Sequence, residues 1–146
     1  MVDQTTSDIV IDAAPPAVMA VIADFGAYPT WATGVKETEI VQQGPGGRTE
    51  RVRFVLDAAP IRDEYVLSYD WQGDKAVTWS LIEGKMLRGL DGTYVLDSHW
   101  DGGTRVTYRL SVDVPIPMIG MLKRKAEKVI IDAALKGLKK RVESAA

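Results

Sequence analysis

Few residues of this chain could do covalent or acid–base chemistry. The sequence contains no cysteine, which excludes a disulfide framework, a thiolate nucleophile and a cysteine metal site. Its one histidine, His99, lies in the segment DSHWDGG, whose composition predicts a hairpin turn and a solvated surface role. Ser98 is its neighbour in the chain, and such adjacency is not the signature of a catalytic triad. No Asp or Glu grouping has a metal-ligand spacing, so we expect no metal and no cofactor.

The length and composition of the chain are those of one ordinary domain. Its 146 residues are 46% hydrophobic and 26% charged, near the averages for globular domains. No apolar run approaches the roughly 18 residues that a membrane-spanning helix needs. The first residues, MVDQTTSDIVID, have neither the basic start nor the apolar centre of a secretory signal. We therefore expect a single domain over residues 1–146, located in the cytoplasm.

Charge is divided unevenly along the chain. Residues 1–114 hold 10 basic and 17 acidic side chains, whereas residues 115–146 hold 8 basic and 3 acidic ones. A basic terminal helix could make transient contact with an anionic membrane surface or an acidic partner; alternatively, its lysines form a solvated helix face. The basic segment lacks interleaved aromatic residues, so we expect no nucleic-acid partner. The sequence is compatible with a monomer or a homodimer.

The positions of the turn residues predict an antiparallel meander flanked by helices. Residues 3–12 suit a first strand, and the two prolines of APPAVMAVIADF fit the first turn of a short helix. A second short helix or turn follows at residues 28–33. From residue 34 to residue 114, turn sequences such as GPGG and DGG separate six strands in which apolar and polar residues alternate. A helical period then runs from residue 118 to residue 142, a length of roughly 37 Å.

One face of the long helix is expected to lie against the sheet. At 100° per residue that face holds Met118, Leu122, Ala126, Val129, Ala133 and Gly137, with Ile119, Ile130 and Ala134 beside it. Several of these residues are small, and a glycine inside a helix costs roughly 1 kcal/mol relative to alanine, so it needs a packing reason. Two interpretations stay open: the small residues let the helix approach bulky aromatic side chains, or they leave space for a ligand. A long helix across a curved sheet tends to enclose an apolar volume, which favours the ligand.

The order of strand, two short helices, six-strand meander and long C-terminal helix resembles the helix-grip fold of the START-like and Bet v 1-like (SRPBCC) superfamily. More narrowly, the chain is similar to the bacterial polyketide cyclase/dehydrase and lipid-transport group. The segments that carry the resemblance are APPAVMAVIADFGAYPTWATGVKETEI, GTYVLDSHWDGGTRVTYRLSVDV and DAALKGLKKRVE. The resemblance implies an α+β fold in which a curved antiparallel sheet of about seven strands (β-α-α-β6-α) wraps around the C-terminal helix and encloses a cavity. The resemblance does not identify a reaction, because this scaffold serves both carriers and enzymes.

The resemblance also implies where a ligand would lie. In such proteins the YPxW cluster, here Tyr28, Pro29 and Trp31, lies beside the mouth of the cavity. Trp31 is the member expected to touch a ligand; alternatively, it fastens the short helices to the sheet. The residues expected to line the cavity come from the apolar strand faces and from the helices: Trp31, Phe54, Tyr65, Trp79, Tyr94, Tyr108, Met118, Leu122, Ala126, Val129 and Ala133.

Two functions follow from this interpretation. The favoured one is binding, and possible transport, of a hydrophobic small molecule such as a lipid, fatty acyl chain, quinone or polyketide. The alternative is a polyketide cyclase or dehydratase, for which the resemblance implies a few polar pocket groups that assist enolisation or dehydration. Asp63, in register with Tyr65, and Arg88, in register with Leu90, are then the acid/base and the anchor; otherwise both are strand-end charges in solvent. No specific cyclase motif is present, which favours binding over catalysis.

Overall fold

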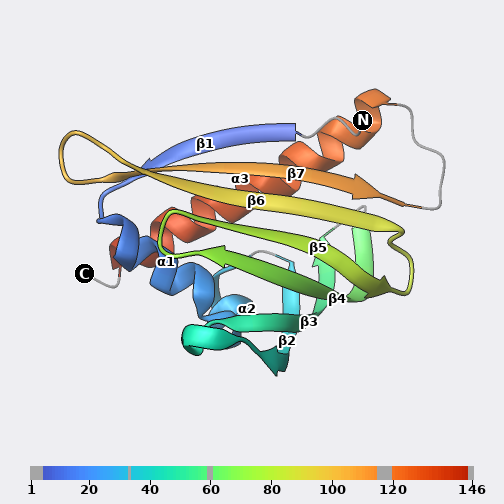
Figure 1. Cartoon of the computed structure of the whole chain (residues 1–146). Helices are drawn as coiled ribbons and strands as arrows, with labels where there is room; N and C mark the ends of the chain where they lie inside the picture. Colours follow the sequence, from blue (N-terminus) through green and yellow to red (C-terminus); the bar gives the residue numbers. More distant parts are fainter. Residues whose placement is uncertain (1–4, 33, 59–60, 115–119, 145–146) are drawn as a thin grey trace.

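A seven-stranded antiparallel sheet forms most of the molecule and curves beside its C-terminal helix (Figure 1). The computed structural model describes residues 5–32, 34–58, 61–114 and 120–144. The strands are β1 (Thr5–Ile11), β2 (Val35–Gln43), β3 (Thr49–Ala58), β4 (Ile61–Gln72), β5 (Ala76–Gly84), β6 (Gly89–Ser98) and β7 (Thr104–Asp113). The helices are α1 (Pro15–Ala23), α2 (Tyr28–Trp31) and α3 (Gly120–Ser144), with short 3₁₀ turns η1 (Phe25–Ala27) and η2 (Pro45–Gly47).

The strands follow the order β1-β7-β6-β5-β4-β3-β2, and every neighbouring pair is antiparallel. The meander from β2 to β7 is therefore extended at its far edge by β1. α3 packs on β1 and β7, and both α1 and α2 contact it near its C-terminal end (Figure 1). This topology confirms the helix-grip fold that the sequence predicts. Within the described ranges, no helix is long and apolar enough to cross a membrane.

Alternation along the strands separates an aromatic inner face from a charged outer face. On β7, Val106, Tyr108 and Leu110 are buried, whereas Arg105 and Arg109 are exposed. Successive side chains of a strand point to opposite faces, so this period of two gives the sheet one dry side and one wet side. The inner faces of β3 to β7 therefore bring most of the aromatic side chains of the chain to one place.

A glycine on β6 makes room for the largest of these side chains. Gly92 is the cross-strand partner of Trp79 on β5. A Cβ atom at Gly92 would lie 2.2 Å from Cε2 and 2.4 Å from Nε1 of the indole. The indole therefore lies across the backbone of β6, with its ring centroid 5.2 Å from that of Tyr94 and 5.6 Å from that of Tyr108. Glycine weakens a strand in general, but here it permits this close approach.

The buried face of α3 differs from the predicted one. Among its described side chains, the buried ones are Ala126, Glu127, Ile131, Leu135, Leu138 and Val142. Val129, expected to face the sheet, is 54% exposed, so that prediction was wrong. Of the predicted positions only Ala126 belongs to this buried stripe, whose centre lies roughly 150° around the helix axis from that of the predicted face.

A buried carboxylate explains this rotation. Glu127 is 1% exposed, and its carboxylate accepts hydrogen bonds from Thr5 Oγ1 at 2.7 Å, from the Val112 backbone N–H at 2.7 Å and from Lys123 Nζ at 2.5 Å. These bonds tie α3 to β1 and β7 at once. A buried charge with several donors is stable where an unpaired one would not be. The inner face of α3 therefore includes an acidic residue, which a search for apolar positions overlooks.

Candidate functional site

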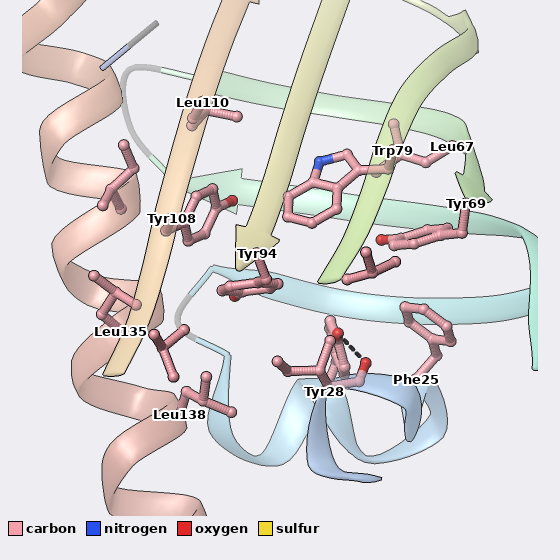
Figure 2. Packing of buried hydrophobic residues seen from close by; sticks show 14 of the residues in the cluster. Phe25, Tyr28, Leu67, Tyr69, Trp79, Tyr94, Tyr108, Leu110, Leu135 and Leu138 are labelled. Atoms are coloured by element: carbon pink, nitrogen blue, oxygen red, sulfur yellow. Dashed lines mark hydrogen bonds between the residues drawn. The ribbon is translucent and has the colours of Figure 1, made fainter. Parts of the chain in front are cut away.

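An apolar cavity of about 100 Å³ lies between the inner face of the sheet, α2 and α3. Its described lining comes from β2 to β7, from the turn between β5 and β6, and from the two helices and the residue after α2: Tyr28, Trp31, Ala32, Val35, Phe54, Leu56, Tyr65, Leu67, Tyr69, Trp79, Leu87, Leu90, Tyr94, Tyr108, Leu110, Val112, Ile130 and Ala134. Figure 2 shows Tyr69, Trp79, Tyr94 and Tyr108 extending toward one another from the strands. None of these described lining residues is a carboxylate or a basic side chain.

The volume of the cavity limits what it can hold as it stands. It is smaller than the roughly 150 Å³ apolar cavity that is known to take a benzene ring. It is also smaller than the roughly 300–1,000 Å³ typical of pockets for drug-sized ligands. The cavity is therefore close to, but below, the size needed for one ring, and binding a ring-sized or larger ligand requires lining side chains to move.

Six of the predicted lining residues meet at this cavity: Trp31, Phe54, Tyr65, Trp79, Tyr94 and Tyr108. The predicted α3 residues with described side chains do not line the cavity, because the helix is rotated about its axis relative to the prediction. Ala126 is buried and Ala133 partly buried, but neither lines the cavity, and Val129 is exposed. Ile130 and Ala134 line it instead. Met118 and the side chain of Leu122 lie outside the described residues.

Sequence reasoning missed two informative lining residues, Tyr69 and Leu87, and placed Tyr28 beside the mouth of the cavity without including it in the lining. Tyr69 shares the strand period of Tyr65, so its spacing was a sufficient signal. Tyr28 stands in the YPTW cluster beside Trp31, with the two ring centroids 4.9 Å apart. Leu87 lies in the turn between β5 and β6, where strand periodicity gives no signal. Its burial, with 4% of its surface exposed, comes from tertiary contacts alone.

The aromatic rings form a continuous wall. The centroids of Tyr94 and Tyr108 lie 4.6 Å apart at 61°, and Trp79 lies 5.7 Å from Tyr69. On the other side, Phe54 stacks on Tyr65 at 5.6 Å. Edge-to-face and offset-stacked pairs at such distances are the favoured aromatic geometries. The wall therefore combines flat apolar surfaces with the hydroxyl groups of its tyrosines.

Burial governs the ionisation of the tyrosines. Removal from water raises the pKa of Tyr65, Tyr69, Tyr94 and Tyr108, because it disfavours the phenolate. The proximity of Tyr108 raises the pKa of Tyr65 and Tyr94 further. Burial likewise raises the pKa of Tyr28, whose hydroxyl donates to the backbone carbonyl of Ile22. All five phenols therefore stay neutral at physiological pH.

Asp63 does not present a free carboxyl group to the cavity. It is 8% exposed, but its Oδ1 accepts hydrogen bonds from the backbone N–H groups of Glu64, Lys85 and Met86 at 2.8, 3.1 and 3.0 Å. Its Oδ2 accepts another from the N–H of Leu87 at 2.9 Å. Asp63 therefore fixes the turn between β5 and β6 and so holds Leu87 against the cavity. This placement corrects the expectation of a pocket acid or base.

The other polar candidates also lie away from the cavity. Arg88 is exposed and absent from the described lining, which corrects its expected role as an anchor. His99 Nδ1 lies 3.0 Å from Asp101 Oδ1 in the hairpin between β6 and β7, and this hydrogen bond lowers the pKa of Asp101. Across the described part of the chain, no group of three or more His, Cys, Asp or Glu side chains is arranged to hold a metal ion.

Close contact between α2 and α3 shapes one end of the cavity. A Cβ atom at Gly137 would lie 2.7 Å from the backbone oxygen of Trp31 and 3.5 Å from its Cε3. Close approach therefore explains the glycine within α3, whereas Ala134 borders the cavity. Trp31 both fastens α2 to α3 and lines the cavity. Its indole Nε1 is buried, with no hydrogen-bond acceptor among the described residues.

Comparison with known proteins agrees with this architecture. A family described as polyketide cyclase / dehydrase and lipid transport matches residues 3–143. A search of curated proteins gave no match.

Several solved structures share the fold over almost their full length. A START superfamily protein from Mycobacterium smegmatis has a TM-score of 0.91 at 18% identity, covering 98% of this chain and 99% of that one. A protein from Thermus thermophilus has a TM-score of 0.82 at 27% identity, covering 99% of both chains. The Zhui aromatase/cyclase from Streptomyces sp. R1128 has a TM-score of 0.75 at 14% identity, covering 98% of this chain and 94% of that one. Identities of 18% and 14% show a shared fold only.

Proposed function

Because this chain belongs to the polyketide cyclase/dehydrase and lipid transport family, we propose that it binds a hydrophobic small molecule in the cavity between its sheet and α3 and carries it. The observation that supports this proposal most strongly is the lining, which has no charged side chain among its described residues. An empty cavity of about 100 Å³ costs a fold roughly 2 kcal/mol in lost packing. Such a cost is a sizeable part of the stability of a domain, and a ligand would offset it.

Apolar burial supplies most of the binding energy in this proposal. Burying about 150 Å² of a ring at about 25 cal/mol per Å² gives roughly 4 kcal/mol before the cost of immobilising the ligand. Even without subtracting that cost, this value corresponds to a Kd no tighter than about 1 mM. A physiological ligand therefore needs further contacts, and Trp31 and Val35 beside the cavity could supply them. We infer that a ring or short apolar segment enters the cavity while the rest of the molecule lies toward α2.

The cyclase or dehydratase alternative has less support from the geometry. Such chemistry needs a group that takes or gives a proton close to the substrate. Asp63 is engaged by four backbone N–H groups, and Arg88 is exposed. The raised pKa of the buried tyrosines makes them hydrogen-bond donors and poor proton donors at neutral pH. Binding is therefore the function that the described cavity supports best.

Two neighbouring alanines of α3 provide a matched test. Ala134 lines the cavity, whereas Ala133 is partly buried and does not. Ala134→Phe should fill the space and abolish binding of ethylbenzene, followed by protein-observed NMR titration. Ala133→Phe should leave that binding within about twofold of the unmodified protein. Equal ethylbenzene binding by both variants would place the site elsewhere and overturn the proposal.

A further inference from the structure

The hydroxyl groups of the cavity share one unusual feature: most of them have no hydrogen-bond partner among the described residues. The chain has five tyrosines, and all five line the cavity. The hydroxyl of Tyr28 donates to the backbone carbonyl of Ile22. The other four tyrosines, each 6–8% exposed, make no hydrogen bond through their hydroxyls within the described residues. Four phenolic O–H groups thus face the cavity without an acceptor from the described part of the chain.

An indole adds a fifth unused donor. Trp31 Nε1 is buried and has no acceptor in the described part of the chain. An indole nitrogen only donates, whereas a phenolic hydroxyl both donates and accepts. Burying a donor without an acceptor carries a free-energy cost, so the buried Trp31 Nε1 requires a reason. The cavity wall therefore suits a ligand that carries hydrogen-bond acceptors.

The wall has no means of compensating a charged ligand. No basic side chain and no carboxylate belongs to the described lining, and the phenols stay neutral because burial raises the pKa of each tyrosine. An anion or a cation that entered would lose its hydration without gaining a counter-charge. A neutral oxygen, by contrast, needs only the O–H groups already in place.

Tyr108 packs between two other rings of the wall: its ring centroid lies 4.6 Å from that of Tyr94 and 5.6 Å from that of Trp79. Figure 2 shows its hydroxyl directed toward Trp79 and away from α3. An acceptor atom near this hydroxyl would also be bordered by the Trp79 and Tyr94 rings, whose centroids lie 5.2 Å apart. A flat ring has the shape that such aromatic surfaces favour.

We propose that the molecule bound in this cavity is neutral, carries a flat ring, and presents a carbonyl-type acceptor oxygen to the hydroxyl of Tyr108. This inference rests on the proposed function and narrows it. Neutral aryl ketones, quinones and uncharged polyketides fit this description. Molecules that would place a free carboxylate or a phosphate within the cavity do not.

Three single-ring probes of similar size separate the contribution of a carbonyl oxygen from the effect of a charge. Acetophenone is neutral with a carbonyl oxygen, ethylbenzene is neutral without one, and benzoate is an anion at pH 7. We expect acetophenone to bind about fivefold or more tightly than ethylbenzene, because one well-placed hydrogen bond contributes about that factor. We expect benzoate to bind at least about tenfold more weakly than acetophenone, because its charge would lose hydration without compensation. Protein-observed NMR titration of the whole chain at pH 7 measures all three.

Tyrosine variants locate the donor. Tyr108→Phe should lower acetophenone affinity about fivefold and leave ethylbenzene affinity unchanged. Thr107→Val is the matched control, because it removes a hydroxyl from the neighbouring position of β7, which does not line the cavity; it should leave the acetophenone preference intact. Tyr94→Phe serves as a second variant if Tyr108→Phe does not fold.

The outcomes distinguish this inference from the proposed function. Equal affinities for acetophenone and ethylbenzene, or tighter binding of benzoate, would overturn the inference while leaving an apolar binding site. An acetophenone preference that survives Tyr108→Phe would also overturn it; if that variant does not fold, a preference that survives Tyr94→Phe would do so. Failure of all three probes to bind would overturn the proposed function, and the inference with it.

Discussion

Replacing Gly92 with alanine should damage the protein more than any ordinary glycine-to-alanine change. The new Cβ would lie 2.2–2.4 Å from three atoms of the Trp79 indole, well inside van der Waals contact. The indole is rigid and buried, with 5% of its surface exposed, so it must turn into the cavity or push β5 and β6 apart. Overpacking of this kind costs about 1–3 kcal/mol. We expect a loss of about 3 kcal/mol and a Tm lower by roughly 10 °C.

A double-mutant cycle with Trp79→Leu tests the stated cause. If the clash with the indole is responsible, Gly92→Ala should cost less than about 1 kcal/mol in the Trp79→Leu background, so that the two changes couple by about 2 kcal/mol. Urea unfolding followed by circular dichroism gives the four free energies. Gly26→Ala is the control, because a Cβ there meets nothing within 4 Å; it should change stability by less than about 0.5 kcal/mol. Additive effects of Gly92→Ala and Trp79→Leu would refute this explanation of the glycine.

Two carboxylates of α3 give further predictions. Glu127→Gln should lower the free energy of unfolding by about 2–3 kcal/mol, because it removes a buried ion with three donors; a loss below about 0.5 kcal/mol in urea unfolding would contradict that role. The pKa of Glu143 is lowered, first because Lys139 donates a hydrogen bond to it and second because the backbone N–H of Asp12 does so. A lowered folded-state pKa stabilises the fold above the unfolded pKa and loses that contribution as the pH falls through the folded value. The free energy of unfolding should therefore decline below about pH 4.5. Glu143→Gln should weaken this decline, which urea midpoints measured from pH 7 to pH 3 would show. An unchanged dependence of the midpoint on pH would contradict this role of Glu143.

Strand and turn patterns carried most of the fold prediction. The alternation that places Tyr108 inward and Arg109 outward is a local property, visible in the sequence because each strand has one dry face. The same period located five of the six predicted residues that line the cavity, all on β3 to β7. Trp31 came from the resemblance of its segment to a known family. Where burial follows from a repeating local pattern, the sequence was therefore sufficient to predict which side chains face the cavity.

The errors arose where one long-range contact decides the position of a side chain. The face of α3 was misplaced because Glu127 is held by Thr5 and Val112, which are distant in the chain. Asp63 was taken for a pocket acid because its strand register is right, but four backbone N–H groups occupy its carboxylate. The need for Gly92 depends on the orientation of an indole on the next strand. None of these contacts leaves a periodic signal.

Native mass spectrometry of the protein purified from its own host, with organic extraction of whatever is released, tests the central claim most directly. The account predicts one neutral, ring-containing, oxygen-bearing molecule per chain, lost from the Ala134→Phe variant and retained by Ala133→Phe. A protein that emerges empty, and that takes up neither ethylbenzene nor acetophenone afterwards, would contradict it.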